Sequence, residues 1–271
     1  MSLNCKTPDD VLKAIADNEA TTVDFRFTDP RGKWQHLAMD SAMVDEDCFS
    51  DGIMFDGSSI AGWKAIHESD MTLMPEAATA VMDPFSAAPS LILFCDVVEP
   101  STGEGYARDP RSTAKRAEAF LKYSGIGDTA YFGPEAEFFV FDEVTFDVSM
   151  NHTFYKLNDS EGPYNTGNEM EGGNIGHRPR VKGGYFPVPP VDSGADFRTE
   201  MIAVMRQMGV QTEKHHHEVA PSQHELGILF NTLVYQADAM QIYKYVVHNV
   251  AHSYGKTATF MPKPVWEDNG S

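Results

Sequence analysis

Alternating apolar and polar residues dominate the first hundred positions of the chain. Residues 22–28 alternate apolar with polar side chains, which predicts a strand with Val23, Phe25 and Phe27 on one face. A turn at 29–32 and a second strand at 34–39 complete a predicted hairpin. Together with an apolar strand at 91–98, this pattern predicts a small α+β unit.

The rest of the chain contains several segments with the helical spacing of apolar residues. Gly, Pro and charged residues without periodicity follow residue 99, and we therefore expect domains at 1–100 and 105–271. Helices are predicted after Asp109, Ser193 and Asn231. Residues 151–190 hold few apolar side chains, which is typical of a lid, a binding loop or a disordered segment.

Two acids lie in an aromatic segment, Tyr131 to Val140, that we interpret as a strand. Side chains alternate faces along a strand, so Glu135 and Glu137 are predicted to point the same way, roughly 6.5 Å apart. Paired carboxylates beside aromatic rings repel each other and lose solvation unless a cation joins them. A strand end emerging into solvent is the alternative, and a divalent cation site is the functional hypothesis.

A second cluster of acids and histidines occupies residues 213–225. Three consecutive histidines invite a zinc interpretation, but the zinc-protease pattern H-E-x-x-H is absent. In an extended segment His216 and Glu218 share a face, and a bend at Pro221 precedes Glu225. Two such acids would complete an oxygen-rich site of the kind that suits Mg²⁺ or Mn²⁺.

Composition excludes several classes of function. The chain has 271 residues and a formal net charge of −19, which argues against nucleic-acid or anionic-membrane binding. Three scattered cysteines favour a reducing, cytoplasmic environment over a disulfide framework. No apolar run reaches the length of a membrane span.

A Gly- and Ser-rich loop at residues 54–63 carries one acid, Asp56, with Ser58 and Ser59 nearby. Such a loop is most simply an ordinary turn. A polar cluster presented to a ligand is the functional alternative, because binding residues often lie on loops. The local sequence leaves both interpretations open.

Five segments, in this order, closely resemble the type I glutamine synthetase family over the whole chain. They are residues 54–63, Gly133-Pro-Glu-Ala-Glu-Phe-Phe139, Gly184-Tyr-Phe-Pro-Val-Pro-Pro190, His216-His-Glu-Val-Ala-Pro-Ser-Gln-His-Glu225 and Lys256-Thr-Ala-Thr-Phe-Met-Pro-Lys-Pro264. The resemblance implies an α+β fold: a β-grasp-like N-terminal domain, then the first part of a catalytic domain built as a split α/β barrel.

The resemblance also implies an activity and a set of site residues. The family makes glutamine from glutamate, ammonium and ATP with Mg²⁺ or Mn²⁺. The implied metal ligands are Glu135, at the metal that bridges the ATP phosphates, and Glu137, Glu218 and Glu225, at the other metal. The implied nucleotide-binding residues are Glu213, Ile228, Leu229 and Phe230, and the implied glutamate-binding residues are Asn269 and Gly270. The implied ammonium-binding residues are Asp56, which also takes the proton, with Ser59 and Tyr185.

Two departures accompany the resemblance. Glu267 stands where the family usually has glycine, which puts the shape of the following Asp268-Asn269-Gly270 loop in question. Further metal, substrate and catalytic residues of the family would follow residue 271, so we expect an N-terminal portion that is inactive alone. In the family two hexameric rings stack into a dodecamer, and the loop bearing Asp56 completes a neighbouring subunit's site.

Two other functions fit the same scaffold. A glutamate–polyamine ligase would keep the metal and nucleotide residues but change the ammonium pocket, which the presence of Asp56 and Ser59 disfavours. A non-catalytic structural or regulatory protein is disfavoured by the presence of all four acids, Glu135, Glu137, Glu218 and Glu225.

Overall fold

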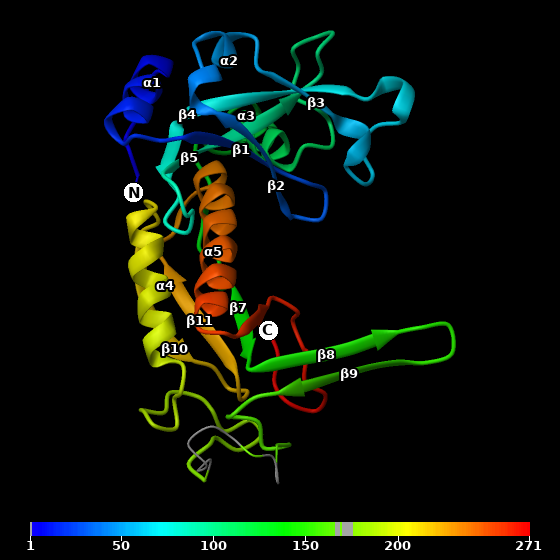
Figure 1. The fold of residues 1–271 in the computed structure, drawn as a ribbon, viewed down its shortest axis with the longest axis vertical. Coiled ribbons are helices and arrows are strands. Elements are labelled where there is room, and N and C mark those ends of the chain that lie inside the picture. Colours follow the sequence, from blue (N-terminus) through cyan, green and yellow to red (C-terminus); the bar gives the residue numbers. More distant parts are fainter. Residues whose placement is uncertain (1, 166–168, 170–175) are drawn as a thin grey trace. The chain divides into compact units, whose positions relative to one another are not determined.

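The computed structural model describes residues 2–165, 169 and 176–271 (Figure 1). The chain forms two compact units, which we describe separately. Unit 1 comprises residues 1–132, 207–209 and 230–242, and unit 2 comprises residues 133–206, 210–229 and 243–271. Helix α5, Leu233–Ser253, contributes its first part to unit 1 and the remainder to unit 2.

Unit 1 is built on a five-stranded sheet with the order β2-β1-β5-β4-β3. Its strands are β1 (Thr22–Thr28), β2 (Trp34–Asp40), β3 (Ile53–Asp56), β4 (Asp70–Met82) and β5 (Ser90–Val98). β1 and β5 run parallel, and the other neighbours are antiparallel. Phe25, Leu73 and Leu93 are completely buried in its core. The predicted hairpin and the strand at 91–98 are therefore confirmed.

Two helices of unit 1, α1 and α3, begin after residues whose side chains accept hydrogen bonds from free backbone amides. In α1 (Pro8–Asp17), the side chain of Thr7 accepts a hydrogen bond from the amide of Asp10. The carboxylate of Asp10 accepts one in turn from the amide of Thr7. In α3 (Pro110–Ser124), Asp109 is the predicted cap, and Gly125 ends the helix in the left-handed conformation. A one-turn helix, α2, spans Asp47–Ser50.

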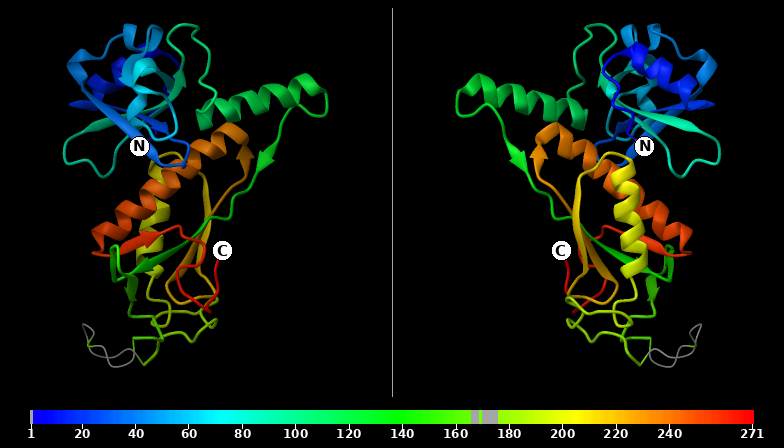
Figure 2. Two further views of the ribbon diagram at one scale, coloured as in Figure 1. Left: turned by 90° about the vertical axis from the view of Figure 1, so that its right-hand side faces the viewer. Right: turned by 90° about the vertical axis from the view of Figure 1, so that its left-hand side faces the viewer.

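Unit 2 is organised around a four-stranded antiparallel sheet with the order β10-β11-β7-β13. Its strands are β7 (Glu137–Phe141), β10 (Thr212–His217), β11 (Gln223–Ile228) and β13 (Thr257–Thr259). Helix α4, Ala195–Gln207, and the second part of α5 lie along one face of the sheet (Figure 2). Phe197 of α4 and Tyr243 of α5 contact His224 and Phe138 on that face.

The predicted strand from Tyr131 to Val140 is wrong as one element. The structure has a short strand β6, Tyr131–Phe132, paired with β12 (Asn231–Thr232), and β7 starts only at Glu137. Pro134 cannot donate a ladder hydrogen bond, which suits the break between the two strands.

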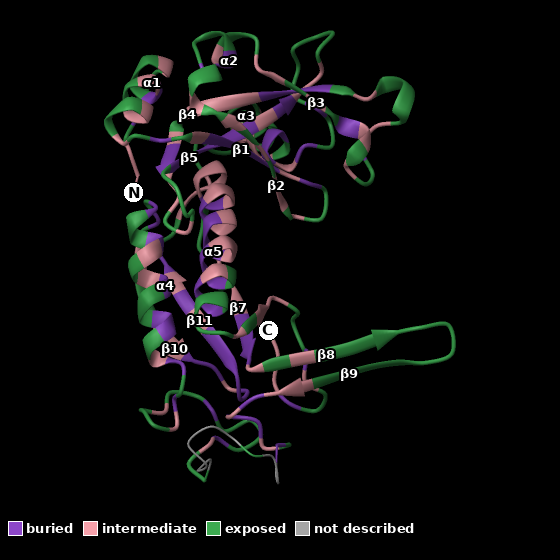
Figure 3. Ribbon diagram, viewed as in Figure 1, coloured by how far each residue is buried: buried purple, intermediate pink, exposed green. Residues whose placement is uncertain are grey.

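A two-stranded hairpin begins before the predicted loop at 151–190, and its second strand lies within that loop. Its strands β8 (Glu143–Val148) and β9 (Thr153–Asn158) extend from the sheet of unit 2 and are largely exposed (Figure 3). The remainder of the predicted loop falls partly outside the described residues. Because the hairpin buries little, its apolar pattern gave a weak signal.

Candidate metal centre

Three predicted metal ligands converge on the face of the unit 2 sheet opposite the helices. Glu225 of β11 pairs directly with Glu137 of β7 on one side and with His216 of β10 on the other. Directly paired residues share a face, so these side chains are neighbours. Glu218, immediately after β10, adds a third carboxylate. The ladder register thus assembles groups that are far apart in the sequence.

The histidine of this cluster is a residue to which sequence analysis assigned no role. Nδ1 of His216 lies 3.4 Å from Oε1 of Glu218, and its Nε2 lies 3.5 Å from Oε2 of Glu225. One ligand atom from each of these three residues lies within 4.8 Å of the others. The two-residue spacing of His216 and Glu218 on an extended segment was the signal that could have identified the histidine.

The carboxylates of the centre destabilise one another's charge. Burial and the negative charge of Glu218 raise the pKa of Glu137, although Ser271 and Gln223 donate hydrogen bonds to it. Burial also raises the pKa of Glu225, and the charges of the neighbouring acids add to this effect. Groups that resist ionisation together are stabilised by a bound cation.

Glu135 lies in the segment between β6 and β7, and it is exposed. It is not part of the three-residue group found among the described residues. Its negative charge nevertheless contributes to the raised pKa of Glu225, so the two carboxylates act on each other. The alternation of a continuous strand does not place Glu135 beside Glu137, because the strand is interrupted.

An aromatic loop borders the centre. Tyr185 and Phe186 stack with ring centroids 3.9 Å apart, and both rings meet His216 edge-on, at 5.8 and 5.0 Å. The amide of Gly184 donates to the carbonyl of Val219 at 2.9 Å, which ties the loop to the segment carrying Glu218. Tyr185 is thereby held beside the histidine of the metal centre.

The C-terminal loop holds the predicted glutamate-binding residues. The buried carboxylate of Asp268 accepts hydrogen bonds from the amides of Asn269, at 2.8 Å, and Lys182, at 3.0 Å. Glu267 has a φ of 64°, the left-handed conformation that glycine adopts most readily. Glu267 therefore adopts a backbone conformation that glycine usually occupies.

The predicted nucleotide-binding residues differ in the exposure of their side chains. Glu213 lies on β10 with an exposed side chain, whereas the side chain of Ile228 is buried at the end of β11. Leu229 donates its amide to the carbonyl of Gln211 at 2.8 Å. Phe230 is exposed and belongs to unit 1. Ile228 would thus contact a ligand through its backbone.

The carboxylate of Asp56 in unit 1 is held by the residues that follow it. Asp56 accepts hydrogen bonds from the amide and hydroxyl of Ser58, at 2.9 and 2.6 Å, and from the hydroxyl of Ser59 at 2.7 Å. These bonds, that from the Ser58 hydroxyl above all, lower the pKa of Asp56. The group is therefore ionised at neutral pH and suited to attract a cation.

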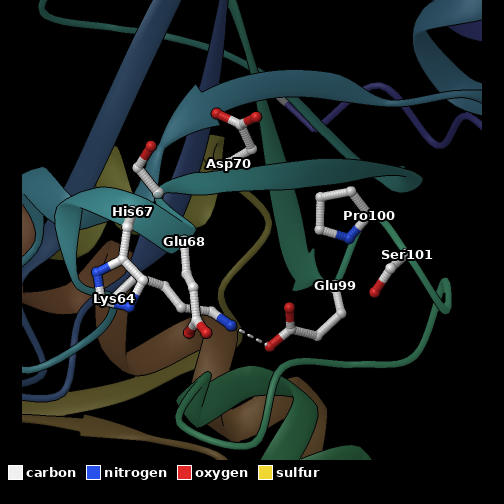
Figure 4. Close-up of a pocket in the computed structure, with 8 residues that line it drawn as sticks. Lys64, His67, Glu68, Asp70, Glu99, Pro100 and Ser101 are labelled. Atoms are coloured by element: carbon white, nitrogen blue, oxygen red, sulfur yellow. Dashed lines mark hydrogen bonds and ion pairs between the residues drawn. The ribbon is translucent and has the colours of Figure 1, made fainter.

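A cavity of about 470 Å³ lies within unit 1 (Figure 4). It is lined by Lys64, His67, Glu68, Ser69, Asp70, Glu99, Pro100 and Ser101. Nζ of Lys64 forms an ion pair with Glu99 at 2.6 Å, and Asp70 is the ladder partner of Asp56. The cavity thus adjoins the strand pair that carries Asp56.

The sequence matches two family models, the β-Grasp domain of glutamine synthetase over residues 19–100 and its catalytic domain over residues 107–271. A glutamine synthetase of Bradyrhizobium diazoefficiens is 64% identical over 266 residues, covering 98% of this chain and 57% of that protein. A 3-hydroxylaminophenol mutase of Cupriavidus pinatubonensis is 57% identical over 263 residues, covering 97% of this chain and 56% of that protein. A cryo-EM structure of Plasmodium falciparum glutamine synthetase matches with a TM-score of 0.92 at 26% identity, covering 99% of this chain and 53% of that chain.

These matches define an α+β protein with a β-grasp domain followed by part of a catalytic domain, which confirms the predicted fold class. The chain belongs to the glutamine synthetase family. It spans about half the length of the curated relatives it matches. None of the helices in the described ranges combines the length and apolar character needed to span a bilayer.

Proposed function

We propose that the protein containing this chain makes glutamine from glutamate, ammonium and ATP. The observation that carries the proposal is the convergence of Glu137, Glu218 and Glu225 on one face of the unit 2 sheet. The identity to glutamine synthetases supports it. The mutase relative shows that a similar identity can accompany a different named activity, so the reaction itself needs a test.

The donor set fits a divalent cation. Carboxylate oxygens, with one imidazole nearby, are the ligands that Mg²⁺ and Mn²⁺ accept in proteins. Glu137 and Glu225 have raised pKa values because burial and neighbouring acids oppose their charge, and a cation would relieve both effects. Glu137, Glu218 and Glu225 would hold one ion, and Glu135 would hold a second, which would supply positive charge to the ATP phosphates.

The reaction divides into two transfers. An oxygen of the glutamate γ-carboxylate attacks the γ-phosphorus of ATP, the bond from that phosphorus to the β–γ bridging oxygen breaks, and ADP leaves. Ammonia then attacks the carbonyl carbon of γ-glutamyl phosphate, a C–N bond forms, and phosphate leaves as its C–O bond breaks. Bound divalent ions supply positive charge to the phosphoryl oxygens during these steps.

The chain's own residues would bind and orient the reactants. Asn269 and Gly270 would hold glutamate in the loop that Asp268 stabilises. Glu213 and the backbone from Ile228 through Leu229 to Phe230 would contact the nucleotide. These roles are assigned by motif.

The ammonium-binding residues of this proposal are Asp56, Ser59 and Tyr185. An ionised Asp56 attracts the ammonium cation. Its lowered pKa makes it a weak base in water, so proton removal requires exclusion of solvent, which raises the pKa of a carboxylate. We propose that the whole protein is a cytoplasmic dodecamer in which Asp56 serves a neighbouring subunit.

The test is phosphate release from ATP by the full-length gene product, with glutamate and Mg²⁺, in the presence and absence of ammonium. Release that requires ammonium supports the proposal. Release only with an added polyamine would make the protein a glutamate–polyamine ligase instead. No release under either condition would favour a non-catalytic protein built on this fold.

A further inference from the structure

A buried carboxylate outside the metal centre, Glu161, is bonded to the segments on which the centre is built. Its side chain is 3% exposed and accepts four hydrogen bonds. One oxygen accepts from the amide and the hydroxyl of Ser193, at 3.1 and 2.6 Å. The other accepts from Nε2 of His217 at 2.7 Å and from the amide of Ser222 at 2.8 Å.

Two of these donors flank a tight turn between metal-binding acids. His217 directly precedes Glu218, and its Nδ1 lies 2.6 Å from the carbonyl oxygen of Glu218. Ser222 has a φ of 66° and ends the turn three residues before Glu225. The amide of Glu218 closes the same turn by donating to the carbonyl of Gln223 at 2.8 Å. One carboxylate oxygen of Glu161 therefore holds both sides of the turn.

We propose that Glu161 is a positioning residue that sets the separation of Glu218 and Glu225. A serine at positive φ is strained and persists because surrounding bonds hold it. Without Glu161 the Ser222 amide and His217 lose a shared acceptor, and the turn can relax. Relaxation of the turn moves the two carboxylates relative to each other. The affinity for a divalent cation depends on the positions of both carboxylates, so it falls.

The electrostatics of Glu161 fit this role. Burial raises the pKa of Glu161, but the hydrogen bonds and charges of its neighbours, those of His217 above all, together lower it below its usual value. Both ring nitrogens of His217 face acceptor oxygens, one on Glu161 and one on Glu218. The carboxylate of Glu161 thus accepts from one ring nitrogen of His217, while the other ring nitrogen faces the carbonyl oxygen of Glu218.

The test measures Mn²⁺ binding to the full-length gene product by the loss of the free-Mn²⁺ EPR signal, with a melting curve for each variant. Glu161→Gln keeps the shape of the side chain, but its amide can accept at only one oxygen position. We expect Mn²⁺ to bind about 10- to 100-fold more weakly, as when other groups that orient metal ligands are changed. If this variant fails to fold, Ser193→Ala removes one donor and should weaken binding a few-fold.

The matched control is Asp142→Asn. Asp142 accepts from the amide of Ser160, the residue before Glu161, at 2.8 Å and pairs with Lys256, so it supports the segment that carries Glu161. The control should lower the melting temperature without changing Mn²⁺ affinity. A merely structural role for Glu161 predicts the same pattern for Glu161→Gln.

The inference rests on the proposed metal site, and the experiment separates the two. A wild-type protein that binds no Mn²⁺ overturns the metal site itself. A wild type that binds Mn²⁺, with Glu161→Gln binding within twofold of it, overturns only the role of Glu161.

Discussion

Glu225 lies directly opposite Glu137 in the antiparallel ladder between β11 and β7. Like charges in directly opposed positions destabilise a sheet, and here burial adds to the effect by raising the pKa of each carboxylate. Placing two acids in this way lowers the free energy of unfolding of the sheet. The divalent cation proposed for this site would offset that cost by binding between the two carboxylates.

Removing a metal ligand should weaken Mn²⁺ binding far more than removing an acid outside the centre. We expect Glu225→Ala and Glu135→Ala to weaken binding at least about tenfold, since each removes a carboxylate from a proposed ion. Glu143→Ala is the control, because Glu143 is an exposed acid at the start of β8. Mn²⁺ titrations followed by EPR measure the difference, and equal losses in all three variants would refute the metal assignment.

The two serine hydroxyls that bond to Asp56 should control its acidity. Their hydrogen bonds favour the ionised form, so Ser58→Ala combined with Ser59→Ala should raise the pKa of Asp56 toward its usual range. Carboxyl ¹³C chemical shifts followed through a pH titration report this pKa directly. Ser50→Ala, which removes a hydroxyl from Asp51 instead, should leave it unchanged. An unaltered pKa in the double variant would show that the backbone bond dominates.

Asp159 predicts a pH dependence of stability. Burial, together with the charges of Glu161 and Asp142, raises the pKa of Asp159 to about 8 from 3.8. Between these values the folded state binds a proton that the unfolded state has released. The stabilising contribution of this group is therefore complete below pH 3.8 and is lost as the pH rises toward 8.

Asp159→Asn isolates this contribution, since an amide oxygen can still accept from the amide of Glu161. We expect the variant to gain stability relative to wild type as the pH rises, by at most about 1.4 kcal/mol per pH unit. Urea unfolding of the metal-free proteins from pH 5 to pH 8 measures the gain. Parallel stability curves for the two proteins would contradict the raised pKa.

Local patterns in the sequence predicted elements whose signal is itself local. The helix start at Asp109 and the alternation of β1 are of this kind, and the structure contains both elements. The prediction of one strand from Tyr131 to Val140 was wrong because the two ends of this segment pair with strands of two different sheets. Side-chain alternation carries no information about which partner strand each half will meet.

The parts of the site that the sequence missed depend on register and tertiary contact. His216 enters the centre because β10 pairs with β11 so that it faces Glu225. Glu161 lies in a segment of low apolar content, and its importance appears only when the distant Ser193, His217 and Ser222 donate to it. The spacing of His216 and Glu218 was a local signal for the histidine, but its pairing with Glu225 and the bonds of Glu161 are not visible as spacings along the chain.

The strained backbone of Glu267 should be relieved by the glycine that the family resemblance places there. A non-glycine residue in the left-handed region costs about 1–2 kcal/mol, and glycine would remove this cost. Glycine also makes the unfolded chain more flexible, which offsets about 0.4–1 kcal/mol of the gain. Glu267→Gly is therefore expected to stabilise the protein by up to about 1 kcal/mol. Glu267→Ala is the control, because it removes the carboxylate but retains the strain at a φ of 64°.

Urea unfolding distinguishes the two Glu267 variants, and a glycine variant no more stable than the alanine variant would contradict the strain. The following residue supports the expectation that the loop keeps its shape in both. Asp268 is buried and holds the amides of Lys182 and Asn269, whereas the side chain of Glu267 is exposed. Substituting Glu267 should therefore change the energy of the loop without releasing the bonds that fix Asn269.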